Sequence, residues 1–305
     1  GAHRRGLVRR PARGRPRDRR GGALVTAPDV VPSAPTAADL RLTDLVSGFG
    51  AVDLTEIQEL ADLQTRVDRK YVVPTSVLVD LLADHQGLRV LEIAGRRRFG
   101  YESVYFDTPA LQSYRSAAHG RRRRFKVRTR TYADSGECVF EVKVKGGRGE
   151  TVKERLAYDR ASAASIDPQA RAFAATVLQQ ALPDARHVVA ALAPTLVTTY
   201  DRTTFVDPVA GTRLTCDAAL LCTPAPQDRS DLAAEGGYST AGHAGLGDQV
   251  VLESKSPGTA TAVDRWLWAR GHRPVSLSKY CVGLAALDAA LPSNRWSRTL
   301  RRHVV

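Results

Sequence analysis

Charged and apolar residues alternate along the middle of the chain, and the alternation predicts β-strands. Within residues 122–132 every second residue is a cation, and the residues between them are apolar or β-branched; the cations are Arg124, Lys126, Arg128 and Arg130. A period of two places each set on its own face of a strand. Residues 138–145 repeat the pattern with Glu141, Lys143 and Lys145, and residues 151–158 with Lys153 and Arg155. We therefore predict three consecutive strands that share a charged face.

The rest of the pattern predicts a mixture of strands and helices. Further strands are expected at residues 65–73, 88–93, 102–107, 195–205, 211–220 and 250–254. Helices are expected at residues 53–63, 74–85, 109–118, 168–182, 259–270 and 278–287. Residues 221–247 are rich in Gly, Ala, Ser and Pro, which predicts a long loop.

Both faces of the central strands are restricted, one to cations and the other to apolar or β-branched residues. A closed barrel satisfies both restrictions, because apolar residues face outward under helices and polar residues fill the interior. The predicted fold class is therefore α+β, a closed antiparallel β-barrel with helices packed on its outside. Such an interior would hold about eight to ten cations.

Composition divides the 305-residue chain into a basic start and a globular remainder. Residues 1–24 hold nine arginines and one acid, which is +8 of the net +13, and residues 25–45 are rich in Ala, Pro and Thr. We expect residues 1–45 to be disordered, 46–290 to form the barrel domain and 291–305 to be a tail. The arginine-rich start is either an extraneous extension or an arm for a polyanion, and both interpretations stay open.

Compartment and redox state follow from what the chain lacks. No apolar run approaches the roughly 20 residues of a membrane span, which predicts a soluble protein, and the cysteine pattern fits a reducing cytoplasm. The cysteines, Cys138, Cys216, Cys222 and Cys281, form no CxxC pair, and we expect them to be buried thiols.

The lysines give the main chemical indication. The chain has 38 arginines and only seven lysines, all of them in short predicted strands or helix starts. A lysine kept where arginine is the usual cation suggests a need for a compact point charge. Cations about 6 Å apart repel by about 3 kcal/mol at an effective dielectric near 20, so a cationic interior calls for a polyanion. Phosphate suits it, and Glu141, Asp217 and Glu253 would hold a divalent cation or form ion pairs.

Nine segments resemble the vacuolar transporter chaperone (VTC) domain, the polyphosphate polymerase family among the triphosphate tunnel metalloenzymes. They occur in family order over roughly residues 65–288: DRKY (68–71), VYFDTP (104–109), KVRTRTY (126–132), FEVKVK (140–145), VKERL (152–156), YDRTTF (200–205), TRLTCD (212–217), LESK (252–255) and SKYCVG (278–283). Each segment alone is weak, and their order makes the resemblance specific.

The resemblance implies a β-tunnel that moves the terminal phosphoryl of ATP onto polyphosphate. The catalytic cations it implies are Arg128, Arg130, Lys143, Arg202 and Arg213. The substrate-binding cations it implies are Lys70, Lys126, Lys153, Lys255 and Lys279. Glu253, with Glu141, would bind Mn²⁺ or Mg²⁺. The expected partners are ATP, polyphosphate and a membrane protein, with no specific nucleic acid.

Two other functions remain open at this point. One is hydrolysis of tripolyphosphate or a nucleoside triphosphate, and the other is a non-catalytic polyphosphate-binding module. The run Arg121–Arg124 likewise has two interpretations, a solvated basic turn or an entrance funnel for anions.

Overall fold

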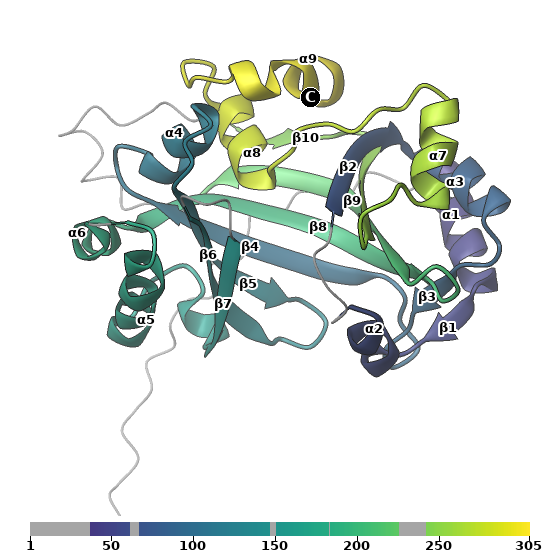
Figure 1. The fold of residues 1–305 in the computed structure, drawn as a ribbon, viewed down its shortest axis with the longest axis horizontal. Coiled ribbons are helices and arrows are strands. Elements are labelled where there is room, and N and C mark those ends of the chain that lie inside the picture. The colour runs from purple at the N-terminus through teal and green to yellow at the C-terminus, as the bar shows by residue number, and fades with distance from the viewer. Residues whose placement is uncertain (1–36, 62–66, 147–150, 183, 226–241) are drawn as a thin grey trace, which may run out of the picture. The chain divides into compact units, whose positions relative to one another are not determined.

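Most of the predicted strands belong to one sheet. The computed structural model describes residues 37–61, 67–146, 151–182, 184–225 and 242–305, all within one compact unit, Pro35–Val305. Its antiparallel path runs β2-β11-β9-β8-β4-β5-β6-β7 (Figure 1). These strands are β2 (Val67–Pro74), β4 (Phe99–Asp107), β5 (Arg124–Tyr132), β6 (Cys138–Lys145), β7 (Thr151–Tyr158), β8 (Ala193–Asp207), β9 (Thr212–Pro224) and β11 (Gln249–Ser256). Short strands β1 (Gly50–Val52), β3 (Arg89–Leu91) and β10 (Ala244–Gly245) lie off this path.

Helices connect and cover the strands. They are α1 (Ala37–Gly48), α2 (Leu54–Ala61), α3 (Thr75–Asp84), α4 (Gln112–Ala118), α5 (Pro168–Gln179), α6 (Ala185–Ala190), α7 (Ala262–Ala269), α8 (Lys279–Leu287) and α9 (Ser297–His303), with 3₁₀ turns η1 (Arg160–Ser162) and η2 (Asn294–Trp296). Among the described residues, no helix has both the length and the apolar content to span a bilayer.

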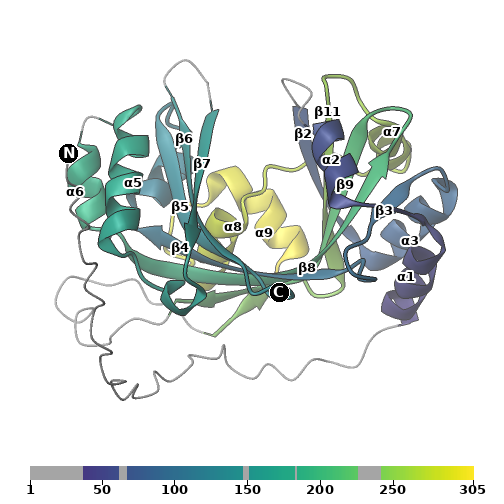
Figure 2. The same cartoon turned by 90° about the horizontal axis from the view of Figure 1, so that it is seen from below.

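The sheet curves into a trough rather than a closed barrel. Figure 2 shows one wall rising through β5, β6 and β7 and the other through β9, β11 and β2, with β8 between them. In the described residues no pairing joins the edge strands β2 and β7, which corrects the expectation of closure. Part of the reason lies at the outer edge of β2, where the Lys70 carbonyl accepts a hydrogen bond from Val275 N at 2.7 Å. That edge is therefore already occupied by the segment that follows α7.

Apolar clusters on the outer faces of the two walls explain the positions of most helices. Helices α5 and α6 pack on the outside of β4, β5 and β6 around the fully buried Phe140 and Leu178. Helices α1, α3 and α7 pack outside β2, β9 and β11 around Leu82, Leu252 and Leu267. Both arrangements follow the predicted rule that apolar positions face outward under helices.

Helix α8 departs from that rule because it packs on the concave face. Its cluster joins Tyr280 and Leu284 to Val72, Tyr105 and Tyr200, which share the face of the inward cations. The rings of Tyr105 and Tyr280 stack with centroids 5.1 Å apart. This helix fills part of the trough, so the open cationic part is shorter than the sheet.

Other differences from the sequence expectations are local. Residues 37–45, expected to be disordered, belong to α1, and residues 297–303, expected in a tail, form α9. Trp296 is 2% exposed in the same cluster as α8, so the C-terminal segment is part of the core. Strand β9 continues to Pro224 because it pairs with β8, where a loop was expected. The arginine-rich start at residues 1–24 and most of the loop expected at 221–247 lie outside the described residues.

Candidate functional site

Strand register places the predicted cations on one concave surface. We define the trough as the concave face of the sheet, which the following cations line by register: Lys70, Arg124, Lys126, Arg128, Arg130, Lys143, Lys145, Lys153, Arg155, Arg202, Arg213 and Lys255. Lys279 joins them from the first turn of α8, where it makes an ion pair with Asp217. The structure thus brings together all ten predicted phosphate-binding cations, and their individual roles stay predictions.

Charged side chains of the two walls act on one another electrostatically across the trough. Lys143 stands on β6, whereas Asp68 and Lys70 stand on β2 and Glu253 on β11. Burial, followed by the charge of Lys126, lowers the pKa of Lys143, and Asp68, Lys70 and Glu253 also act on it. Because β6 and β2 are far apart along the sheet path, these electrostatic contacts pass through the interior.

The first wall, formed by β5, β6 and β7, contains a cluster of cations around the buried carboxylate of Glu141. The second wall is formed by β9, β11 and β2. Glu141 is 2% exposed, and its two carboxylate oxygens contact Arg128, Arg130, Lys153 and Arg155. The Lys153 Nζ lies 2.7 Å from Oε1 and the Arg155 Nε 3.0 Å. Burial opposes ionisation of Glu141, but Arg128, Arg130 and Lys153 outweigh it and hold its pKa well below the usual range. These surroundings favour the ion-pair interpretation of Glu141 over the metal interpretation.

A second buried carboxylate, Asp217, connects the sheet to α8. Arg202 donates to it from Nε at 2.6 Å and from the second guanidinium nitrogen at 2.8 Å, and Lys279 makes an ion pair with it. Burial would raise the pKa of Asp217, yet Lys279 and Arg202 lower it to about 2. Ser278, the N-cap of α8, accepts from Lys126 Nζ at 2.9 Å. The start of α8 is therefore tied to both walls.

Glu253, on the second wall, has two cationic partners, both of them lysines. It lies 2.6 Å from Lys70 Nζ and 3.3 Å from Lys255 Nζ. Burial would raise its pKa, but Lys70 and Lys255 hold it well below the usual range. Asp68 lies on the same face, opposite Lys255 in register. No group of three or more His, Cys, Asp and Glu side chains able to hold a metal occurs in the described parts of the chain. Glu253 and Asp68 suit a cation that arrives with phosphate oxygens as its other ligands.

Sequence reasoning missed the aromatic residues of the trough. The Arg202 guanidinium lies 5.2 Å from the ring centroid of Tyr101 and 5.4 Å from that of Tyr200. The Lys279 ammonium lies 4.2 Å from the Tyr200 ring. Tyr105 is fully buried, and Arg128, Lys126 and Lys279 lower its pKa against the effect of that burial. Residues 101, 103 and 105 lie on one face of β4, because side chains alternate along a strand. That spacing was the signal that could have placed Tyr101 and Tyr105 on the inner face of the sheet.

Several buried polar atoms on the same face make no hydrogen bond within the described residues. They are Ser103 Oγ, Thr198 Oγ1, Thr215 Oγ1 and Arg130 Nε. The Arg130 Nε has only a 3.8 Å ionic contact with Glu141. Buried polar groups are normally satisfied, so the inner face of the sheet has more polar atoms than the described side chains pair.

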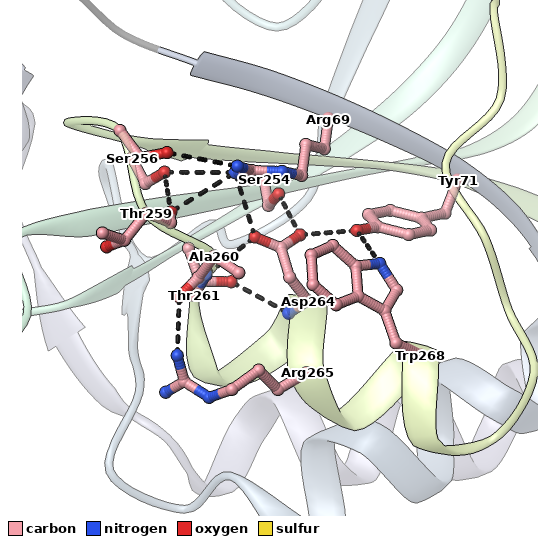
Figure 3. Close-up of polar contacts among 11 residues, drawn as sticks. Arg69, Tyr71, Ser254, Ser256, Thr259, Ala260, Thr261, Asp264, Arg265 and Trp268 are labelled. Carbon is pink, nitrogen blue, oxygen red and sulfur yellow. Dashed lines mark hydrogen bonds and ion pairs between the residues drawn. The ribbon is translucent and has the colours of Figure 1, made fainter.

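A buried network on the outside of the second wall holds β2, β11 and α7 together (Figure 3). Asp264 is fully buried and accepts from Tyr71 Oη at 2.7 Å and from Ser254 Oγ at 2.6 Å. It also forms a capping box with Thr261, and Arg69 Nη1 lies 3.4 Å away. Because Arg69, Tyr71 and Ser254 alternate with Lys70, Glu253 and Lys255, this network fixes the backbone that presents the inward charges.

Comparison with known proteins gives a match to one family model. The family model described as the VTC domain matches residues 65–288. A Hippeastrum structure, described as a candidate adenylyl cyclase with a dominant triphosphatase activity, is similar at 13% identity and a TM-score of 0.41, covering 72% of this chain and 96% of that one. A candidate adenylate cyclase from Bacillus halodurans gives 12% identity and a TM-score of 0.41, covering 70% and 94%. No curated protein sequence matches.

Proposed function

This chain belongs to the VTC domain family, and from that membership we propose that it transfers the terminal phosphoryl group of ATP to a polyphosphate chain bound in the trough. One observation carries the proposal, the convergence of cations from both walls on one interior surface. Cations held this close repel one another, and a bound polyanion removes that repulsion. An arginine side chain can donate to two phosphate oxygens at once, and a lysine side chain binds a single oxygen as a point charge.

The proposed chemistry needs positioning and charge rather than a covalent nucleophile. The bond between the γ-phosphorus and its bridging oxygen breaks, the new bond forms to a terminal oxygen of the polyphosphate, and ADP leaves with the bridging oxygen. The attacking oxygen is already ionised near neutral pH, so no general base is required. Arg128, Arg130, Arg202 and Arg213 would stabilise the charge on the transferring group and its neighbours.

Glu253 and Asp68 would hold the Mn²⁺ or Mg²⁺ that accompanies the phosphates. Such an ion withdraws charge from phosphate oxygens. Lys70 and Lys255 then exchange part of their contact with Glu253 for contact with phosphate. Glu141, with its four cationic contacts, serves instead to fix the arginines of the first wall.

Incubation of the purified chain with ATP and Mn²⁺, followed by a gel that separates polyphosphate from orthophosphate, tests the proposal. We expect long polymer from the wild type and a loss of about 100-fold or more in rate for Glu253→Gln and for Arg202→Gln. Arg186→Gln, on the exposed surface of α6, is the matched control and should retain the wild-type rate. If no polymer forms with any divalent cation while the chain still binds tripolyphosphate, the polymerase proposal is refuted. The non-catalytic polyphosphate-binding module would then be the remaining interpretation.

Hydrolysis is the second candidate, and the open trough favours it. Because the described residues of β2 and β7 do not pair, water has a route to a bound triphosphate that a closed barrel would restrict. Release of orthophosphate from ATP or tripolyphosphate without polymer growth would select this activity over the polymerase.

A further inference from the structure

Outside the trough, two segments distant in sequence form a single arginine-rich surface. We define the exterior strip as the exposed residues Arg115, Arg121, Arg122, Arg123, Arg295, Arg298, Arg301 and Arg302. Residues 112–125 and 291–305 contain no acidic residue. None of the eight arginines makes an ion pair within the described part of the chain, in contrast to Arg202 or Arg128 in the trough.

Packing brings the two segments side by side. The rings of Tyr114 on α4 and Trp296 on η2 lie with centroids 5.7 Å apart, and Tyr114 Oη donates to the Pro292 carbonyl at 3.1 Å. A side chain at Gly120 would come within 3.3 Å of Arg295 Nη1, so the turn after α4 touches the strip directly. Figure 1 shows α4, α8 and α9 along the same side of the sheet. The contact makes the eight arginines one surface rather than two.

Helical spacing extends this surface along the C-terminal segment. Arg295, Arg298 and Arg301 follow one another at intervals of three residues, and Arg302 stands four residues after Arg298, which places them on one broad side of η2 and α9. The opposite side is buried, since Thr299 is 3% exposed and Leu300 packs against the core that contains α8.

The exterior strip is also continuous with the trough. Residues 121–123 lead directly into β5, whose inward cations begin with Arg124 and Lys126. The four residues from Gly120 to Arg124 can span at most about 13 Å, so residues 121–123 lie within that distance of the first inward cation, Arg124. A flexible anionic polymer longer than the trough could contact both at once.

From these observations we infer that the exterior strip binds the part of a long polyphosphate chain that lies outside the trough. The inference rests on the proposed function for its choice of polymer. Each arginine can bind phosphate oxygens, which provides the affinity. A longer polyphosphate chain contacts more arginines of the row, so the affinity increases with chain length.

Two other anionic partners fit the surface less well. A bilayer partner would be held by an exposed apolar helix face, but that face of α9 is buried. Single-stranded nucleic acid is usually bound through bases stacked on exposed aromatic rings, whereas Tyr114 and Trp296 are 0% and 2% exposed. Polyphosphate has neither bases nor acyl chains, so charge alone suffices for it.

Binding of polyphosphate of about 100 units and of tripolyphosphate to the full chain, at low and moderate salt, tests the inference. The variant Arg295→Gln/Arg298→Gln/Arg301→Gln/Arg302→Gln should bind the long polymer at least tenfold more weakly at low salt, with a shallower salt dependence. Its tripolyphosphate affinity should stay within twofold of the wild type. The matched control is Arg160→Gln/Arg186→Gln/Arg265→Gln/Arg273→Gln, which removes the same charge from exposed positions elsewhere and should stay within twofold for both ligands.

Several outcomes would overturn the inference. They are an unchanged long-chain affinity, an equal loss in the control variant, an equal loss for tripolyphosphate, or a preference of the strip for anionic vesicles or a single-stranded oligonucleotide over polyphosphate at equal charge. If the four-site variant does not fold, Arg121→Gln/Arg122→Gln/Arg123→Gln gives the same readout from the other segment. A wild type that makes no polymer but binds long chains through these arginines would refute the proposed function and support the strip.

Discussion

The two walls of the trough carry similar side chains but balance their charge differently. The wall of β5, β6 and β7 presents eight inward cations and one carboxylate, Glu141. The facing side, β2, β11, β9 and the adjoining β8 with the start of α8, presents five cations and three carboxylates. Its cations are Lys70, Arg202, Arg213, Lys255 and Lys279, and its carboxylates are Asp68, Asp217 and Glu253.

The difference separates two tasks within one interior. On the first wall Lys126, Lys143 and Lys153 stand directly opposite one another in register, and of the three Lys153 alone makes an ion pair with a described residue, Glu141. These three lysines repel one another and have little negative charge beside them. A bound phosphate therefore lowers the electrostatic energy more at this row than at cations that are already paired. On the second wall the carboxylates already position the cations, so a ligand must exchange with existing pairs. The first wall is therefore suited to affinity, and the second to positioning and to a metal.

Substitution Glu141→Gln is the strongest way to break the first wall. Removal of the buried anion leaves four cations without their counter-charge, and we expect a loss of about 3 kcal/mol in the free energy of unfolding, measured in urea. Saturating tripolyphosphate should restore part of this stability, because it binds only the folded chain. The exposed Glu137→Gln should change stability by less than about 0.5 kcal/mol. A Glu141 variant as stable as the wild type would contradict the assigned role.

Substitution Asp264→Asn tests whether the outer network stabilises the second wall. It removes the charge that Arg69 contacts and weakens the acceptor for Tyr71 and Ser254, so we expect a loss of about 2 kcal/mol in urea unfolding. The control Asp84→Asn breaks an exposed pair with Arg270 and should cost less than about 0.5 kcal/mol. Equal effects of the two variants would refute the special position of Asp264.

The comparison of walls is sharpened by matched lysine substitutions. Lys143→Gln should weaken tripolyphosphate binding about tenfold, or about 1.4 kcal/mol, since Lys143 makes no ion pair with a described residue. Lys255→Gln should weaken it only about threefold, because Lys255 already lies 3.3 Å from Glu253. Calorimetric titration at fixed salt measures both, and a larger loss for Lys255→Gln would reverse the assignment of tasks.

The smallest expected effect is a pH dependence that originates in the first wall. Burial lowers the pKa of Lys153 to about 8, although Glu141 partly opposes the shift. Lys153 therefore loses its charge as the pH rises through 8, and tripolyphosphate affinity should fall about twofold to threefold between pH 7 and pH 9. In Lys153→Arg the cation stays charged throughout, and this part of the decline should disappear. A decline of the same size in both proteins would place its origin elsewhere.

Much of the site could be predicted because strand parity is a local property. The alternation around Arg128 and Lys143 identified both the strands and their inward faces before any partner strand was known. Arg155 was placed on the correct face, but its contact with Glu141 depends on the β6–β7 register. Tyr101 and Tyr200 were missed because an aromatic residue on a strand fits an outer face equally well. The ends of β9 and the presence of α9 depended on pairing and packing with distant segments.

The sequence by itself determined where the main strands lie, which face of the central strands is charged, and that this face is cationic, because side chains alternate along any strand whatever lies beside it. Only the tertiary structure decided that the sheet stays open between β2 and β7, that α8 occupies the concave face, and which carboxylate holds which cation. These outcomes depend on the curvature of the sheet and on contacts between residues up to about two hundred positions apart, which no local periodicity encodes.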